Sequence, residues 1–337
     1  MKLQFKRIIS KIYSSSPYPE IFIRKIYWYP FFHKILVNLN MQIKKKYRKK
    51  MNKSANIKGL NSKLLVEGLK SLNIKNGDIL LVHSSMDGLQ GTSLQPNDVL
   101  QNLREIVGEE GTIVMPCFQK FKKSETSNSS VSENESSDDV LEYRYRDYIC
   151  WTGLLNSIFL MQPYTIRSYF PNNSLAAQGP HAKAMMEHNL EGDLPHGKNS
   201  AWEYCVNKHA KVLFLGLKAD HCFTLIHTVE DILDEQWPVK NWYKKQKYKI
   251  IDGDKERIIT IRQRKLEWAK YLTEKYGTNE IRKAGLLNTY EFGGVTVEYI
   301  DDVNVFFNYL KDKVLYHNDL VFFKVPSKFL KKIEVKK

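Results

Sequence analysis

From about residue 77 onward the chain alternates short apolar runs with amphipathic stretches, the pattern typical of strands and helices in an α/β core. Residues 79–85, ILLVHSS, read as a buried strand, and residues 111–118, GTIVMPCF, as a second one. Between them, residues 97–107 carry their apolar side chains on one helical face, which predicts a helix. The three segments predict a βαβ unit, so the expected fold class is α/β.

The same pattern continues towards the carboxyl terminus. The polar, acidic residues 122–140 have almost nothing to bury, so we expect a mobile surface loop there, either a lid or a plain insertion. A hairpin is expected over 248–261, with its turn at Asp252-Gly253. No repeat or interdomain linker interrupts residues 59–337, which are expected to form one domain. The other predicted elements are helices at 152–161, 180–189, 200–207 (capped by Ser200), 224–235, 266–277 and 303–313, and a strand at 211–216.

Residues 1–58 form a basic amphipathic extension. They hold 15 Lys or Arg and one acid, Glu20, so +14 of the net +15 lies here and the remaining chain is close to neutral. Basic residues and Pro30 interrupt every long apolar run, which excludes a membrane-spanning helix. Two interpretations stay open: peripheral contact with an anionic membrane at its inner face, strengthened by KKKYRKK at 44–50, or a solvated, oligomer-forming or partly disordered arm. The neutral body and the lack of a recognition motif argue against nucleic acid.

The four cysteines give no sign of a disulfide framework or a metal site. They show no C-x-x-C pairing and no cleavable secretory pattern precedes them, so reduced thiols explain them best, although a single cysteine nucleophile stays open. We therefore expect a cytoplasmic protein without a bound metal. The cysteines are Cys117, Cys150, Cys205 and Cys222.

Two short motifs are candidates for chemistry. In FTLIHTVED, His227 stands three residues before Glu230, so a helix would place both side chains on one face near the end of a strand. Histidine is the natural general base at neutral pH, although this spacing also occurs on solvated helix faces. In HSS at 83–85, hydroxyls and amides would hold a phosphate or a pantetheine amide, or would merely end the strand. Neither motif is decisive alone.

Taken together and in order, these segments resemble the aminoglycoside 3-N-acetyltransferase family. The resemblance is carried by LLVHSSM (80–86), GTIVMPCF, IRSYFPNNSLAAQGPHA (166–182) and VLFLGLKADHCFTLIHTVED (212–231). It covers about residues 64–235 well and the last third loosely. It implies a three-layer α/β/α fold with a central mixed sheet, acetyl-CoA or another acyl-CoA as donor, and direct transfer to an amine without a covalent enzyme intermediate. A homodimer is also a reasonable expectation from the family.

The resemblance also implies roles for individual residues. His227 matches the family's catalytic histidine, Glu230 an acid that places the acceptor amine or tunes that base, and Thr224 a hydroxyl suited to the thioester carbonyl. The alternatives for the supporting residues are structural: an ion pair for Arg167 and helix caps for Ser174 and Thr224. The residues that match coenzyme A binding, or shaping of its groove, are Ser84, Ser85, Arg167, Ser168 and Ser174.

Two departures from the family bear on the acceptor. Phe170 stands where the family usually shows a histidine, and GKNSA at 197–201 places Lys198 where an acid is common. Aminoglycosides are polycations, whereas a lysine and a basic extension favour anionic acceptors. The expected function is therefore N-acylation of an amino sugar, or a nucleotide-linked amino sugar, in surface polysaccharide synthesis. Aminoglycoside resistance and a non-catalytic, membrane-associated scaffold are the alternatives.

Overall fold

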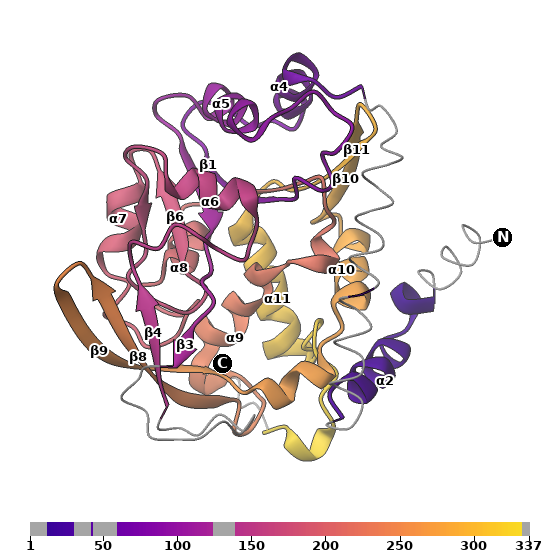
Figure 1. Ribbon diagram of the computed structural model, residues 1–337. Helices are drawn as coiled ribbons and strands as arrows, with labels where there is room; N and C mark the ends of the chain where they lie inside the picture. The colour runs from indigo at the N-terminus through magenta and orange to yellow at the C-terminus, as the bar shows by residue number, and fades with distance from the viewer. Residues whose placement is uncertain (1–11, 30–41, 43–58, 124–138, 332–337) are drawn as a thin grey trace.

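A seven-stranded mixed sheet forms the centre of our computed structural model, which describes residues 12–29, 42, 59–123 and 139–331 (Figure 1). The strand order is β10-β11-β7-β1-β2-β6-β5. Strands β7, β1 and β2 are parallel, and the strands outside them run antiparallel to their neighbours. The bounds are Ile79–Ser84 (β1), Thr112–Pro116 (β2), Ile166–Arg167 (β5), Leu175–Gln178 (β6), Lys211–Leu215 (β7), Asn288–Phe292 (β10) and Val295–Ile300 (β11).

Helices cover both faces of this sheet because its central strands are apolar on both sides. On β1, Leu80 and Val82 belong to one core with α4, α5 and α6, whereas Leu81 belongs to the other core with α7 to α11. The predicted three-layer α/β/α architecture around a mixed sheet is confirmed. The helices are Ser62–Ser71 (α4), Pro96–Val107 (α5), Leu154–Leu160 (α6), Ala182–Glu187 (α7), Ala201–Asn207 (α8), Thr228–Leu233 (α9), Glu274–Lys283 (α10) and Val303–His317 (α11), with short 3₁₀ turns at Ala219–His221 (η1) and Ser327–Phe329 (η5).

Most elements predicted from the sequence are confirmed. The βαβ unit consists of β1, α5 and β2, and the strand expected at 211–216 is β7. The helices α6, α7, α8 and α11 lie where the apolar pattern places them. Ser200 caps α8 as expected, since its hydroxyl accepts the backbone N–H of Glu203 at 3.0 Å.

The continuous helix predicted over 224–235 is wrong. The segment divides into the 3₁₀ turn η2 (Thr224–His227), helix α9 and a second 3₁₀ turn, η3 (Asp234–Gln236). Asp234 takes a φ of 44°, which ends α9 because a regular helix needs a negative φ. His227 therefore lies at the junction of η2 and α9, and Glu230 lies inside α9.

The continuous helix predicted over 266–277 is also wrong. It divides into the 3₁₀ helix η4 (Leu266–Tyr271) and α10. Between them, Thr273 donates its backbone N–H to the carbonyl oxygen of Phe322 at 2.7 Å. This tertiary bond takes the chain out of the helix, so here packing overrides the local pattern.

A separate four-stranded sheet, ordered β3-β4-β8-β9, was predicted only in part. The expected hairpin is longer than 248–261, and its turn residues are Gly253 and Asp254 rather than Asp252 and Gly253. Residues 124–138 of the predicted loop lie outside the described residues, whereas both ends of the predicted span belong to strands. The bounds are Lys122–Lys123 (β3), Val140–Arg144 (β4), Tyr243–Asp252 (β8) and Lys255–Arg264 (β9).

Part of the basic extension packs against the domain as helix α2 (Tyr18–Tyr27), at the edge of the molecule in Figure 1. Glu20 accepts the backbone N–H groups of Glu274 at 3.0 Å and Lys275 at 3.1 Å, at the start of α10. A carboxylate is favourable at this end of a helix because the free N–H groups carry partial positive charge. Ile21 is buried, whereas Phe22 is 66% exposed.

The segment at 44–50 and most of the extension lie outside the described residues. Within the described ranges, no helix combines the length and the apolar composition that a membrane crossing requires.

Candidate active site

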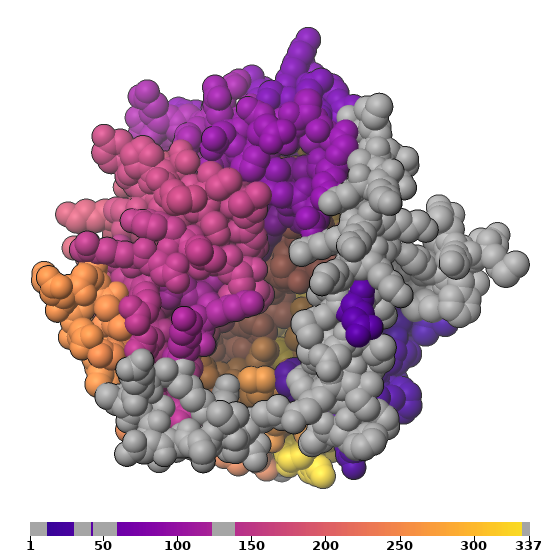
Figure 2. Space-filling model, in the orientation of Figure 1, coloured from indigo at the N-terminus to yellow at the C-terminus, as the bar shows by residue number. Residues whose placement is uncertain are grey.

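The carboxyl ends of the parallel strands β7, β1 and β2 meet at one edge of the central sheet, where α/β proteins commonly bind ligands. A cavity of about 240 Å³ lies at this edge. Ser84, the last residue of β1, and Thr224, the first residue of η2, both line it. The structure therefore brings together two residues that were predicted from separate motifs. Figure 2 shows the surface hollowed at its middle, with the segment that follows β7 (salmon to orange) at the floor.

His83 also lines this cavity, although the sequence analysis gave it no role of its own. Its buried ring stacks on Phe214 with the centroids 5.0 Å apart, and burial lowers its pKa to about 3, so the ring is neutral at pH 7. In the described part of the chain, His83 Nε2, Ser84 Oγ and Asn156 Oδ1 are buried without a hydrogen-bond partner, and all three residues line the cavity. Buried polar atoms normally have partners, so these three offer hydrogen bonds to a ligand or to water.

Ser85 faces the turn after β1. Its hydroxyl accepts the N–H of Gly88 at 3.2 Å, and its own N–H donates to the carbonyl oxygen of Leu215 at 3.0 Å. The turn is so close to β7 that a Cβ on Gly88 would lie 1.6 Å from the carbonyl oxygen of Gly216. The structure therefore gives Ser85 a bonded position in a tight turn and does not place it among the residues lining the cavity.

Arg167, Ser168 and Ser174 lie behind the cavity rather than in it. All three are buried, and their side chains are bonded within the protein. Arg167 donates to the carbonyl oxygen of Cys117 and to one other main-chain carbonyl, and the Ser174 hydroxyl donates to the same Cys117 oxygen at 2.8 Å. Ser168 Oγ donates to Asn189 Oδ1 at 2.5 Å. Of the roles that the sequence suggested, shaping of the groove fits this bonding better than direct contact with coenzyme A.

His227 and Glu230 are brought together as the spacing predicted. Glu230 Oε1 lies 3.0 Å from His227 Nδ1, with the carboxylate side chain 3% exposed and the imidazole 14% exposed. The ring is therefore close to the surface of the site and not sealed in the core. It stands at the other end of η2 from Thr224, one 3₁₀ turn away from the cavity.

Arg264, at the end of β9, completes this cluster and was not predicted. Its Nη1 donates to His227 Nδ1 at 3.2 Å and lies 3.8 Å from Glu230 Oε1. Its guanidinium lies over the ring of Phe323, 5.2 Å from the centroid. No signal in the sequence pointed to it, because the hairpin brings it to His227 from 37 residues away.

Burial and the Arg264 charge set the proton affinities in this cluster. The pKa of His227 is held well below its usual value, first by burial and then by the positive charge of the Arg264 guanidinium. Burial raises the pKa of Glu230, and the Arg264 guanidinium opposes that shift. Arg264 thus favours a neutral imidazole and partly offsets the burial that favours a protonated Glu230.

A second histidine–acid pair lies beside the first. His196 Nδ1 is 2.9 Å from Asp231 Oδ2, both side chains are buried, and the His196 ring centroid is 5.6 Å from that of His227. Asp231 Oδ2 also accepts the backbone N–H of His196, and the Tyr243 hydroxyl lies 2.8 Å from the main-chain oxygen of Glu230 and 3.1 Å from Asp231 Oδ1. This pair is fully bonded inside the protein.

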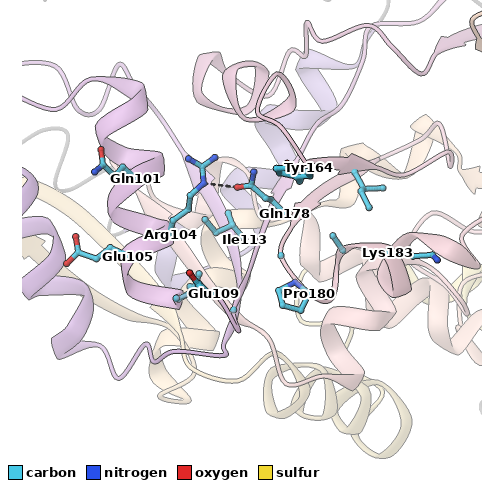
Figure 3. A pocket seen from close by; sticks show the side chains of 15 residues that line it. Gln101, Arg104, Glu105, Glu109, Ile113, Tyr164, Gln178, Pro180 and Lys183 are labelled. Atoms are coloured by element: carbon cyan, nitrogen blue, oxygen red, sulfur yellow. Dashed lines mark hydrogen bonds between the residues drawn. The ribbon is translucent and has the colours of Figure 1, made fainter.

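A larger cavity of about 930 Å³ lies elsewhere, between α5 and α7 beside the start of β2 (Figure 3). On its wall, Arg104 Nε donates to Gln178 Oε1 at 2.7 Å. None of the residues predicted for the site lines it. Among the described residues, no group of three or more His, Cys, Asp or Glu side chains is arranged to hold a metal ion.

Comparison with known proteins identifies the family. The sequence model of the aminoglycoside 3-N-acetyltransferases matches residues 81–306, about two thirds of the chain. The chain belongs to this family. It is 29% identical over 188 residues to aminoglycoside N(3)-acetyltransferase III of Acinetobacter baumannii, covering 53% of this chain and 63% of that protein. It is 32% identical over 171 residues to the aminoglycoside N(3')-acetyltransferase-like protein YokD of Bacillus subtilis strain 168, covering 48% and 62%. These alignments span less than two thirds of either relative.

The family fold extends over more of the chain than those alignments. The solved structure of AAC-IIIb with CoASH superposes with a TM-score of 0.61 and 20% sequence identity, covering 80% of this chain and 99% of that one. His227, Glu230 and Arg264 lie within residues 81–306, the stretch that the family model matches, whereas Phe323 lies beyond it. Helix α2 precedes that stretch.

The two departures from the family pattern take different places in the structure. Phe170, where aminoglycoside 3-N-acetyltransferases usually show a histidine, packs with Tyr248 and Ile261 in a small core against the β8-β9 hairpin. It thereby supports the hairpin that carries Arg264. Lys198 is exposed.

Proposed function

We propose that this protein transfers an acyl group from acyl-CoA, with acetyl-CoA as the first choice, to the amine of an amino sugar or a nucleotide-linked amino sugar. One observation carries the proposal: a partly exposed His227 with Glu230 Oε1 3.0 Å from its Nδ1, one 3₁₀ turn from a cavity lined by Ser84 and Thr224. Membership of the family and the CoASH complex of AAC-IIIb support the choice of donor.

In the proposed reaction, His227 acts as general base. The acceptor nitrogen attacks the thioester carbonyl carbon while the imidazole takes the proton that the nitrogen loses. The carbonyl oxygen becomes negative, and the Thr224 hydroxyl donates a hydrogen bond to it. The C–S bond then breaks, the amide forms, and the proton passes from the imidazolium to the sulfur of coenzyme A. Glu230 orients the ring and stabilises its positive charge, while Ser84 binds the pantetheine arm.

The charges around His227 support an anionic acceptor over a polycation. Two acids that contact the hairpin, Asp193 and Asp234, are both paired with Arg262 at 2.6 and 2.7 Å. Asp231 is bonded to His196 and Tyr243. A polycationic aminoglycoside needs free carboxylates, and in the described part of the site these are already engaged. N-acylation in surface polysaccharide synthesis is therefore preferred over aminoglycoside resistance.

Thiol release from acetyl-CoA tests the proposal. The panel should contain aminoglycosides, free amino sugars and nucleotide-linked amino sugars at equal concentration. We expect release with the nucleotide-linked amino sugars and little with the aminoglycosides. Turnover of aminoglycosides alone would reverse the preference for the acceptor, and acetyl-CoA binding without turnover of any amine would favour the scaffold alternative.

We also propose that the protein is cytoplasmic and that its extension contacts an anionic membrane at the inner face. In support, Phe22 and Ile23 of α2 are exposed, and residues 1–58 carry 14 of the 15 net positive charges. Co-sedimentation of the full chain with vesicles of anionic lipid should exceed that with neutral vesicles, and Phe22→Glu should reduce it. Equal binding to both vesicles would remove the idea. A homodimer completes the proposal and is tested by sedimentation equilibrium.

A further inference from the structure

Nδ1 of the His227 ring has two neighbours, one of which can bond to it only if it carries a proton and the other only if it has a free lone pair. Glu230 Oε1, at 3.0 Å, would accept a proton carried by Nδ1. Arg264 Nη1, at 3.2 Å, donates to Nδ1 and so requires a lone pair there. A neutral imidazole carries its proton on one nitrogen only, so the two neighbours cannot both bond to Nδ1 at once.

The choice between them decides which nitrogen is the base. When Glu230 holds Nδ1–H, Nε2 has a free lone pair and can take a proton from an acceptor amine. When Arg264 donates to Nδ1, the proton sits on Nε2, which then has no lone pair to offer. Arg264 Nη1 lies within hydrogen-bond distance of Nδ1 in the structure, and a bond there requires the second arrangement.

We propose that Arg264 binds an anionic group of the acceptor, a phosphate or a carboxylate, and that this binding moves the guanidinium away from His227 Nδ1. Glu230 then takes the proton on Nδ1, and Nε2 becomes the base. Arg264 therefore binds the anionic group of the acceptor and also positions the proton of the His227 ring. The inference rests on the proposed acyl transfer and specifies two further points: the acceptor is anionic, and its binding makes Nε2 the base.

The way Arg264 is held supports this role. Its neighbour on the same face of β9, Arg262, donates to both oxygens of Asp193 and of Asp234, at 2.6 to 2.9 Å. Apart from its 3.2 Å bond to His227 Nδ1, Arg264 has the long 3.8 Å approach to Glu230 and the face of Phe323, and its side chain is 23% exposed. A guanidinium prefers two parallel hydrogen bonds to a phosphate or carboxylate, and Arg264 lacks such a partner within the described site.

The other charged groups near the ring do not compete for that anion. His196 is bonded to Asp231, and the Glu230 carboxylate would repel an anion. Arg262 already has two carboxylates. In the described site, Arg264 has no bidentate carboxylate partner, so it can turn towards an anion that approaches His227 from the hairpin side.

A matched pair of acceptors tests the inference. Glucosamine and glucosamine 1-phosphate differ by one anionic group, and kcat/KM is measured for both with the wild type, Arg264→Gln and Arg264→Lys. We expect Arg264→Gln to lower the ratio of kcat/KM for the phosphate to kcat/KM for the unphosphorylated sugar about 10- to 100-fold, the range for losing hydrogen bonds to a charged group. Arg264→Lys should fall between, because it keeps the charge without the fork. The charge-matched control is Arg257→Gln, because Arg257 is an exposed arginine of the same strand. This variant should change neither kcat/KM for either sugar nor the ratio between the two values.

A readout that needs no turnover separates this inference from the proposed function. Nitrogen chemical shifts of the His227 ring report which nitrogen carries the proton, and inorganic phosphate is titrated into the wild type and Arg264→Gln. Phosphate should move the proton from Nε2 to Nδ1 in the wild type only. If the protein acylates amino sugars but phosphate does not move the proton, the inference about Arg264 is wrong and the proposed function stands. If phosphate moves the proton but no amine is acylated, the proposed function is wrong and the effect of Arg264 on the ring stands. Equal losses for both acceptors in Arg264→Gln would mean a structural role only.

Discussion

Two histidine–acid pairs stand side by side, with their acids adjacent on α9, and they differ in how fully their atoms are bonded. Asp231 accepts the main-chain and ring N–H groups of His196 and the hydroxyl of Tyr243. Asn173 Nδ2 lies 3.3 Å from the other ring nitrogen of His196. Each polar side-chain atom of this pair has a hydrogen-bond partner within the protein.

The pair of His227 and Glu230 is incomplete by comparison. Two neighbours share one ring nitrogen, and Glu230 Oε2 is buried without a hydrogen-bond partner in the described part of the chain. Unsatisfied buried groups cost stability, and they persist where a ligand or a change of state can satisfy them. This difference between two adjacent acids of one helix supports a structural role for the Asp231 pair and the proposed reactive role for the Glu230 pair.

The largest expected effect is on turnover when the reactive pair is broken. His227→Ala should lower kcat by the ~10²–10⁴ usual for loss of a general base, because no other group in the cluster can take the amine proton. Steady-state kinetics and the binding of acetyl-CoA by calorimetry check it together. Full activity in this variant would end the assignment, and normal acetyl-CoA binding is the control for the fold.

The next effect is on stability when the saturated pair is broken. Asp231→Asn turns one acceptor into a donor among three N–H and O–H donors, which should lower the free energy of unfolding by about 3 kcal/mol. Urea denaturation measures it. The matched control is Glu191→Gln, because Glu191 and His188 form an exposed pair at 2.6 Å that should matter little. Equal losses in the two variants would contradict the contrast drawn here.

The sequence predicted those parts of the molecule whose signals are local. The βαβ unit and the His227–Glu230 pairing depend on residues a few positions apart, so apolar periodicity and motif spacing were sufficient. The position of His83 could also have been predicted, because alternation along β1 puts it on the same side of the sheet as Leu81. The role of Ser85 could not have been predicted, because its hydroxyl bonds within a turn against Gly216 that only the packing of β1 on β7 creates.

The parts that the sequence did not predict depend on long-range pairing. Strand β4 pairs with β8 in parallel, about a hundred residues apart, so nothing local marks it as a strand of a second sheet. The register of β8 with β9 then decides that Arg264, and not another of the many basic residues of the hairpin, meets His227. A one-residue slip would turn Arg264 to the opposite face.

A smaller effect concerns the pH dependence of the reactive pair. The pKa of His227 is lowered in the folded protein, so the limb of kcat/KM that belongs to the base should lie below pH 6.5, separate from the limb set by the acceptor amine. Arg264→Gln removes a positive charge that lowers this pKa, so the limb should move to higher pH. The profile is measured with glucosamine, which has no titrating anion. A limb that stays in place would mean that Arg264 does not act on the ring.

The smallest effect extends the contrast from histidines to serines. Ser174 is saturated, since its hydroxyl donates to the Cys117 carbonyl at 2.8 Å, whereas Ser84 Oγ is buried beside the cavity and has no partner in the described chain. Ser174→Ala should lower the free energy of unfolding by about 1 kcal/mol and leave KM for acetyl-CoA unchanged. Ser84→Ala should leave the free energy of unfolding nearly unchanged and raise the KM for acetyl-CoA several-fold, because we expect the hydroxyl to bond to acetyl-CoA and not to the protein. If Ser174→Ala raised the KM for acetyl-CoA and Ser84→Ala lowered stability instead, hydrogen bonding within the protein would not distinguish structural serines from binding ones. Direct contact of Ser174 with coenzyme A would then be the better interpretation.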